Sequence, residues 1–504
     1  ATATAILGID TLWGGDVMNP SGTGRFIADS WFSDEPLPRA YKHPAAAKLR
    51  QSGGVAGKNI DVSAVDAYLR AIDIPAAIGE LNEAAGNAGQ LRGAYLQGLC
   101  ECLGVMWDLV QERLERGAAV PYERCVTAST GAAPTPSDPV AKRERIAELL
   151  ARQGYRSATR AKLLAAVDAW RLERRVPKKS IAMLADACIA QFDAGTAQHL
   201  VPYLPRALRD VPRANIQFLA IENAWFSGSM NYIGRARNRD GSPQYEATYE
   251  INAALEISVP EFMQLVSHEV VPGHVTNFAW LQALYARRKL GFESTVLTMN
   301  TRGAALSEGI ANNAILMAFG VTEIDELPDV DLQIGTLLAL LQDDAKNQSS
   351  FLTWEKRWPQ DKVRGVLRNE FLCSDERADN LSGAGGRHPL RGRDVSGVRG
   401  VVRACNAGGH VHRHRARGLR RVHRRTRHRD HAGAGRRSHH PGARRARARH
   451  VRRRSNGDVR RQRVGEVDAR LRRVARPVRE REGQRRGPAL VDRRRREGLG
   501  ERGL

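Results

Sequence analysis

Apolar side chains recur at steps of three and four residues over much of the first 372 residues, a spacing that places them on one face of an α-helix. The longest such run covers residues 91–116, and residues 158–176 and 332–341 repeat the pattern. These runs are longer than an ordinary strand. The chain is therefore predicted to be mainly α-helical.

Strand signals are few, and the best are residues 216–221 and 245–251, which are rich in β-branched and aromatic side chains. A loop rich in Pro at 128–140 separates two helical regions. We predict a small β element and three parts: an N-terminal helical region at 1–130, a metal-binding catalytic region at 131–382, and a tail at 383–504.

A helix start precedes the most informative segment. Ser258 has the character of an N-cap, Pro260 suits the first turn, and Glu261 is placed to complete a capping box. Apolar residues follow at helical spacing up to the segment His-Glu-Val-Val-Pro-Gly-His at 268–274. We therefore expect this segment to lie on a helix.

Two imidazoles and a carboxylate fall within these seven residues, and His268 and His274 are half of the four histidines that precede residue 373. Neutral imidazoles are good Zn²⁺ ligands, and a glutamate beside them, here Glu269, can take a proton from a metal-bound water. Positions six apart point to different sides of a regular helix, so Pro272-Gly273 is expected to break it and return His274 toward His268.

A third ligand is expected from Glu308, a lone acid in an apolar helical run at 303–312. A buried carboxylate is costly unless it is paired or bound to metal. The alternatives are a glutamate on a solvated face or bonded to a neighbouring helix, and two histidines satisfied within the core.

At these residues the chain resembles a bacterial metallopeptidase-like family of unknown function that typically reads HEGYPGHH and then EGWA. The second motif stands here as Glu308-Gly309-Ile310-Ala311, and Val275 replaces the second consecutive histidine. The likeness is specific over about residues 245–320. It implies a mostly helical, gluzincin-like metallohydrolase with peptidase or other amide-hydrolase activity.

The resemblance implies that His268, His274 and Glu308 bind one zinc ion and that Glu269 is the catalytic base. Related peptidases keep a strand before the metal helix that pairs with an extended substrate, and residues 245–251 are expected to be that strand. Three tyrosines near it are candidates for contacting the oxyanion or the substrate: Tyr232, Tyr245 and Tyr249.

The composition changes abruptly near Cys373. Residues 373–504 contain 40 Arg, no Lys and 13 acids, a net charge of +27, whereas residues 1–372 carry −3. The tail holds ten of the fourteen histidines and lacks Phe, Tyr, Trp, Ile and Met. Without large apolar side chains it is expected to be disordered.

Three interpretations of the tail compete. An Arg-rich arm could bind nucleic acid through phosphates, although it has no aromatic residues to stack on bases. A plain disordered extension is the second. The third, which we favour, is out-of-frame translation of a GC-rich gene; the family usually has a Tyr-x-x-Gly element near its C-terminal end, and no tyrosine follows Tyr285 here.

The sequence shows no signal peptide and no long apolar segment, so we expect a cytoplasmic protein with no membrane partner. The six cysteines do not have zinc-finger spacing, and we expect their thiols to be reduced. The sequence predicts a zinc-dependent hydrolase of peptides or small amides rather than a nucleic-acid partner. The alternatives are a catalytically impaired, truncated homologue and an Arg-tailed nucleic-acid-binding protein.

Overall fold

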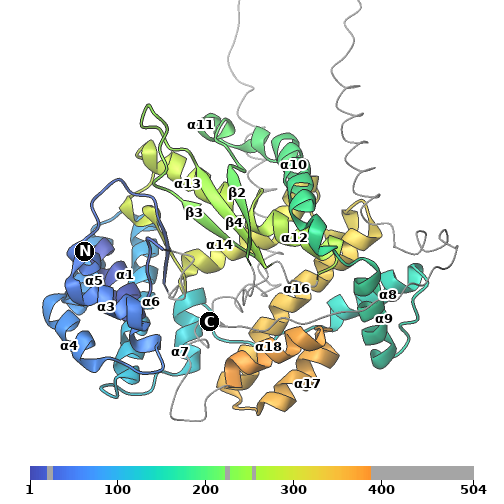
Figure 1. Cartoon of the computed structure of the whole chain (residues 1–504), viewed down its shortest axis with the longest axis horizontal. Helices are drawn as coiled ribbons and strands as arrows, with labels where there is room; N and C mark the ends of the chain where they lie inside the picture. The colour runs from blue at the N-terminus through green and yellow to red at the C-terminus, as the bar shows by residue number, and fades with distance from the viewer. Residues whose placement is uncertain (20–26, 222–227, 253–256, 387–504) are drawn as a thin grey trace, which may run out of the picture.

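The computed structural model of the chain describes residues 1–19, 27–221, 228–252 and 257–386 (Figure 1). Helices dominate these residues, and five short strands accompany them. The predicted mainly α fold with a small β element is therefore confirmed. We expected a disordered tail from residue 383. Its residues beyond 386 lie outside the part of the chain that the structure describes.

The N-terminal part is a group of helices on one side of the molecule, at the left of Figure 1. They are α1 (Thr2–Leu12), α2 (Arg39–Lys42), α3 (Pro44–Ser52), α4 (Val62–Ala71), α5 (Ile74–Gly86), α6 (Gln90–Arg113) and α7 (Tyr122–Thr130). Asp61 and Asp73 cap α4 and α5, because each carboxylate accepts a backbone N–H at 2.9 Å. The apolar faces of α1 to α6 share one core around the buried α1.

The remaining helices surround the central sheet and extend below it in Figure 1. They are α8 (Val140–Arg152), α9 (Arg160–Glu173), α10 (Ile181–His199), α11 (Arg206–Arg209), α12 (Val259–Glu269), α13 (His274–Ala286), α14 (Arg302–Asn312), α15 (Ala314–Phe319), α16 (Val330–Ser350), α17 (Gln360–Glu370) and α18 (Asp375–Gly386). One core lies between the sheet and helices α10, α12, α13 and α15, and another joins α8, α9 and α16 to α18.

The main sheet has three strands in the order β2-β4-β3, formed by β2 (Ile216–Ile221), β3 (Gly228–Ile233) and β4 (Glu246–Asn252). Strand β4 pairs in parallel with β2 and antiparallel with β3. The strand expected at 245–251 to receive an extended substrate is thus the central strand, with both hydrogen-bonding edges already used. That expectation was wrong. A second sheet pairs β1 (Ala28–Trp31) with β5 (Val296–Thr298).

The loop predicted as a boundary lies along α16. The Asn347 amide donates to the Thr135 carbonyl at 3.1 Å and to the Ser137 hydroxyl at 2.7 Å, and the Gln348 side chain accepts the Ser137 N–H at 2.9 Å. The division into regions 1–130 and 131–382 stays a prediction. The loop itself is fastened to the second region by these bonds.

Helix α12, which carries the metal motif, is anchored at its start by a buried ion pair. Ser258 is the N-cap as predicted, since its hydroxyl accepts the Glu261 N–H at 3.3 Å. The Glu261 carboxylate binds the Arg171 guanidinium of α9 at 2.9 Å and also accepts from Gln342 of α16 at 3.1 Å. Arg171 donates in turn to the Leu372 carbonyl at 2.8 Å. Three segments distant in sequence, α9, α16 and the chain at Leu372, therefore fix one end of α12.

Candidate metal centre

A sharp turn between α12 and α13 brings the two motif histidines together. Helix α12 ends at Glu269 and α13 begins at His274, so Pro272 and Gly273 lie in the break between them. The imidazole rings of His268 and His274 have centroids 4.8 Å apart and planes at 88°. The break predicted from the six-residue spacing is present and has the predicted consequence.

Thr276, in the first turn of α13, holds this turn in place. Its backbone N–H donates to the Val270 carbonyl at 3.2 Å. Its hydroxyl lies 3.1 Å from the same carbonyl oxygen and 2.7 Å from that of Arg213. The turn is thereby bound both to α13 and to the segment leading into β2.

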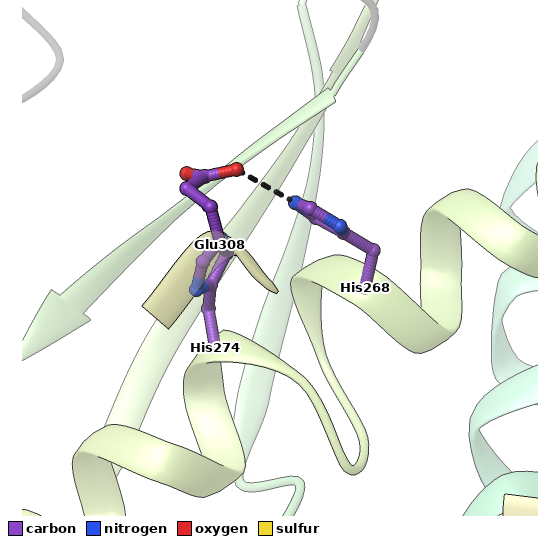
Figure 2. A group of neighbouring side chains, drawn as sticks. All are labelled: His268, His274 and Glu308. Carbon is purple, nitrogen blue, oxygen red and sulfur yellow. Dashed lines mark ion pairs between the residues drawn. The ribbon is translucent and has the colours of Figure 1, made fainter. Parts of the chain in front are cut away.

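Glu308 reaches the histidines from α14, a helix whose N-cap Thr301 accepts the Ala304 N–H at 3.2 Å. Glu308 Oε2 lies 3.4 Å from His268 Nε2, and Glu308 Oε1 lies 3.3 Å from His274 Nε2. Figure 2 shows the three side chains converging from three helices. The structure thus brings together all three residues that the sequence indicated as ligands.

The donor set fits a tetrahedral zinc site. One ligand atom from each of His268, His274 and Glu308 can be chosen so that all lie within 4.8 Å of one another. Ligands about 2.0–2.1 Å from a tetrahedral metal are about 3.3 Å apart, close to the two nitrogen–oxygen distances. Two imidazoles and one carboxylate leave a fourth position open, which is the composition of a catalytic zinc site.

The three side chains are strongly coupled electrostatically. Burial lowers the pKa of the His268 imidazole, but the hydrogen bond and charge of Glu308, with the charges of Glu269 and Asp343, outweigh it and raise that pKa to about 9. Burial favours a raised pKa for Glu308, yet the two imidazoles bring it well below its ordinary value. Since zinc binds neutral imidazole, a zinc ion bound at this site would displace that proton.

Glu269, the expected base, is the last residue of α12 and is half-buried. Its Oε2 accepts the backbone N–H of Met230 at 3.3 Å. Met230 pairs with Tyr249 in the register of β3 and β4, so an N–H bound to Glu269 points away from β4. The outer edge of β3 therefore faces the glutamate, whereas the sequence had indicated residues 245–251 as the strand that pairs with a substrate.

The three candidate tyrosines have different surroundings. The Tyr232 hydroxyl donates to Gln282 Oε1 at 2.7 Å within the core. Tyr249 is fully buried in the central strand, and burial and the charge of Glu269 raise its pKa well above the ordinary value. Within the described ranges its hydroxyl has no hydrogen-bond partner. Tyr245 is half-buried, with a positive φ of 53°.

Sequence reasoning missed three groups around the site: the Met230 N–H, the Asp343 carboxylate and the Ser307 hydroxyl, which lies 3.3 Å from His274 Nδ1. Ser307 directly precedes Glu308, but a serine within a helix is not by itself a signal. Val275, where the resembling family has a second histidine, is fully buried in the core.

No family model matches this chain, and no curated protein does. Among solved structures, it is similar to a "putative lipoprotein of unknown function" from Shewanella oneidensis, with 12% identity and a TM-score of 0.41 over 79% of this chain and 75% of that one. It is also similar to a "putative lipoprotein" from Colwellia psychrerythraea, with 16% identity and a TM-score of 0.39 over 68% of this chain and 60% of that one.

The expected cytoplasmic location needs correction. Both similar structures are described as putative lipoproteins, so the expectation of a cytoplasmic location is not kept. Within the described residues no single helix is long and apolar enough to cross a membrane. Two consecutive helical segments, Arg302–Asn312 and Ala314–Glu326, are together long and apolar enough to do so, but the chain bends by 44° between them.

Proposed function

We propose that this protein is a zinc-dependent hydrolase of peptide or related amide bonds. The observation that carries the proposal is the convergence of His268, His274 and Glu308 beside Glu269, the first two brought together by a backbone break. This donor set, with the adjacent carboxylate, is the arrangement of a hydrolytic zinc site. A zinc ion bound there would supply Lewis-acid polarisation of a carbonyl and a more acidic water.

Glu269 is the group that would move the proton. Its Oε2 accepts the Met230 N–H, which fixes the orientation of the carboxylate. Its Oε1 can then take a proton from the attacking water and pass it to the leaving amine.

The outer edge of β3 is the proposed support for the substrate. Since the Met230 N–H points outward, the backbone groups of Gly228 and Tyr232 point the same way in a regular strand. An extended chain hydrogen-bonded along that edge would lie beside Glu269. This mode of binding gives affinity through main-chain bonds and leaves side-chain preference to other contacts.

Zinc content tests the site. After dialysis, elemental analysis of the full-length protein should find about one zinc per chain, as expected for a three-ligand open site. The variants His268→Ala, His274→Ala and Glu308→Ala should each lose most of it. His199→Ala, which removes a histidine at the end of α10, is the matched control and should retain it. Unchanged zinc in the three ligand variants would refute the site.

A further inference from the structure

The His274 imidazole is contacted on three sides. Its Nε2 lies 3.3 Å from Glu308 Oε1, and its Nδ1 lies 3.3 Å from the Ser307 hydroxyl oxygen. The ring stacks on Phe278, with centroids 5.8 Å apart and planes at 13°. His274 is itself only 7% exposed. The ring therefore contacts Phe278 of its own helix on one face, and two consecutive residues of α14, Ser307 and Glu308, lie at its two nitrogens.

The Ser307 hydroxyl occupies a position between α13 and α14. Asn277, one turn after His274 on α13, directs its side-chain Nδ2 toward Ser307 Oγ at 3.5 Å. An amide N–H can only donate, so Ser307 Oγ acts as an acceptor on this side. A hydroxyl oxygen has two lone pairs, and one remains for a second donor.

Zinc binding sets the protonation required of His274. An imidazole that binds metal through Nε2 keeps its single proton on Nδ1, and that N–H needs an acceptor. Ser307 Oγ is the group at the required position. We propose that Ser307 is a positioning residue that accepts the Nδ1–H of His274, fixing the tautomer and the ring orientation that present Nε2 toward Glu308.

This inference rests on the proposed zinc site, in which Glu308 and His274 are ligands. Ser307 and Glu308 are adjacent on α14, so one turn of helix supplies both a ligand and the support of another ligand. Ser267 offers a matched comparison: it directly precedes the ligand His268, but its hydroxyl donates to Gln264 of its own helix at 2.8 Å. Removing that hydroxyl should leave the metal site unchanged.

The test measures the zinc affinity of the metal-free, full-length protein by competition with a chromogenic chelator. Ser307→Ala should bind zinc about 10–100-fold more weakly, the usual effect of losing a partner behind a metal-binding histidine. Ser307→Thr keeps the hydroxyl and should restore the affinity to within about threefold. Ser267→Ala should match the parent.

The visible spectrum of Co²⁺ bound in place of zinc gives a readout that general stability does not change. The band positions of Ser307→Ala should shift from those of the parent, whereas Ser307→Thr and Ser267→Ala should keep them. Equal zinc affinity and an unchanged spectrum in Ser307→Ala would overturn this inference alone. A parent that binds no zinc, or a His274→Ala variant that binds it as well as the parent, would overturn the proposed site and this inference with it.

Discussion

A Cβ atom at residue 273 would lie 1.7 Å from the carbonyl oxygen of His268, far inside any van der Waals contact. The turn that joins the two motif histidines therefore closes only because residue 273 is glycine. The contact is with backbone, which cannot move aside without opening the turn. The glycine of the motif thus has a steric role that is independent of any metal.

Gly273→Ala should open this turn and separate the histidines. We expect a loss of about 2–4 kcal/mol in the free energy of unfolding, the range for strong backbone conflicts, and loss of most bound zinc. Gly309→Ala is the matched control, because Gly309 lies beside the ligand Glu308 in a helix and a Cβ there meets nothing within 4 Å. It should be neutral or stabilising by up to about 1 kcal/mol. Urea unfolding and zinc analysis would measure both, and equal behaviour of the two variants would contradict the steric argument.

The buried pair of Arg171 and Glu261 should be a strong determinant of stability. Glu261 is 4% exposed and binds both Arg171 and Gln342, so Glu261→Ala leaves a buried guanidinium without its carboxylate. We expect a loss of about 3–5 kcal/mol, the usual result of removing one partner of a buried pair. Asp66→Ala breaks the exposed pair with Arg116 and should have little measurable effect. A small effect of Glu261→Ala in chemical denaturation would show that α12 is anchored by other contacts.

Asp10, in α1, should make stability fall as pH rises. Burial raises the pKa of its carboxyl to about 8, despite the N–H that Ala28 donates to it at 3.1 Å. The unfolded chain releases this proton near its ordinary pKa of about 4. Between these two values the folded state binds the proton and the unfolded state does not, so rising pH favours unfolding until about pH 8.

Asp10→Asn should remove this dependence. The difference in unfolding free energy between parent and variant should change by about 1.4 kcal/mol per pH unit across the middle of that window. Burial also raises the pKa of Asp344 to about 6, but both proteins carry this residue, so its contribution cancels in the difference. Urea titrations at several pH values provide the measurement. Parallel pH profiles for the two proteins would show that Asp10 is ionised in the fold.

The sequence predicted those features that depend on neighbours along the chain. The helix start at Ser258, the break at Pro272 and Gly273, and the convergence of the two histidines follow from local rules of capping and backbone geometry. Glu308 followed from the cost of a lone acid in an apolar helical run, with the motif resemblance as support. Periodicity found most of α6 and α9, whose apolar positions recur regularly.

Features that depend on distant contacts were missed. Helix α16 was predicted only at 332–341, because its continuation is polar; Asp344 there pairs with Lys142 at 2.7 Å, and Gln342 binds Glu261. Strand β3 contains Gly, Ser and Asn and shows no apolar alternation, and its place depends on β4. The acceptor role of Ser307 depends on the packing of α13 against α14.

Hydrolysis by the zinc-loaded protein tests the central claim most directly, with Glu269→Gln as the decisive variant. The parent should cleave members of a quenched fluorescent peptide library, lose that activity to a chelator and regain it with zinc. Glu269→Gln can still accept the Met230 N–H but cannot take a proton, so it should keep the parent's zinc content and lose at least about a hundredfold in rate. A zinc-loaded parent that cleaves no peptide or amide, or a Gln variant as fast as the parent, would contradict the account.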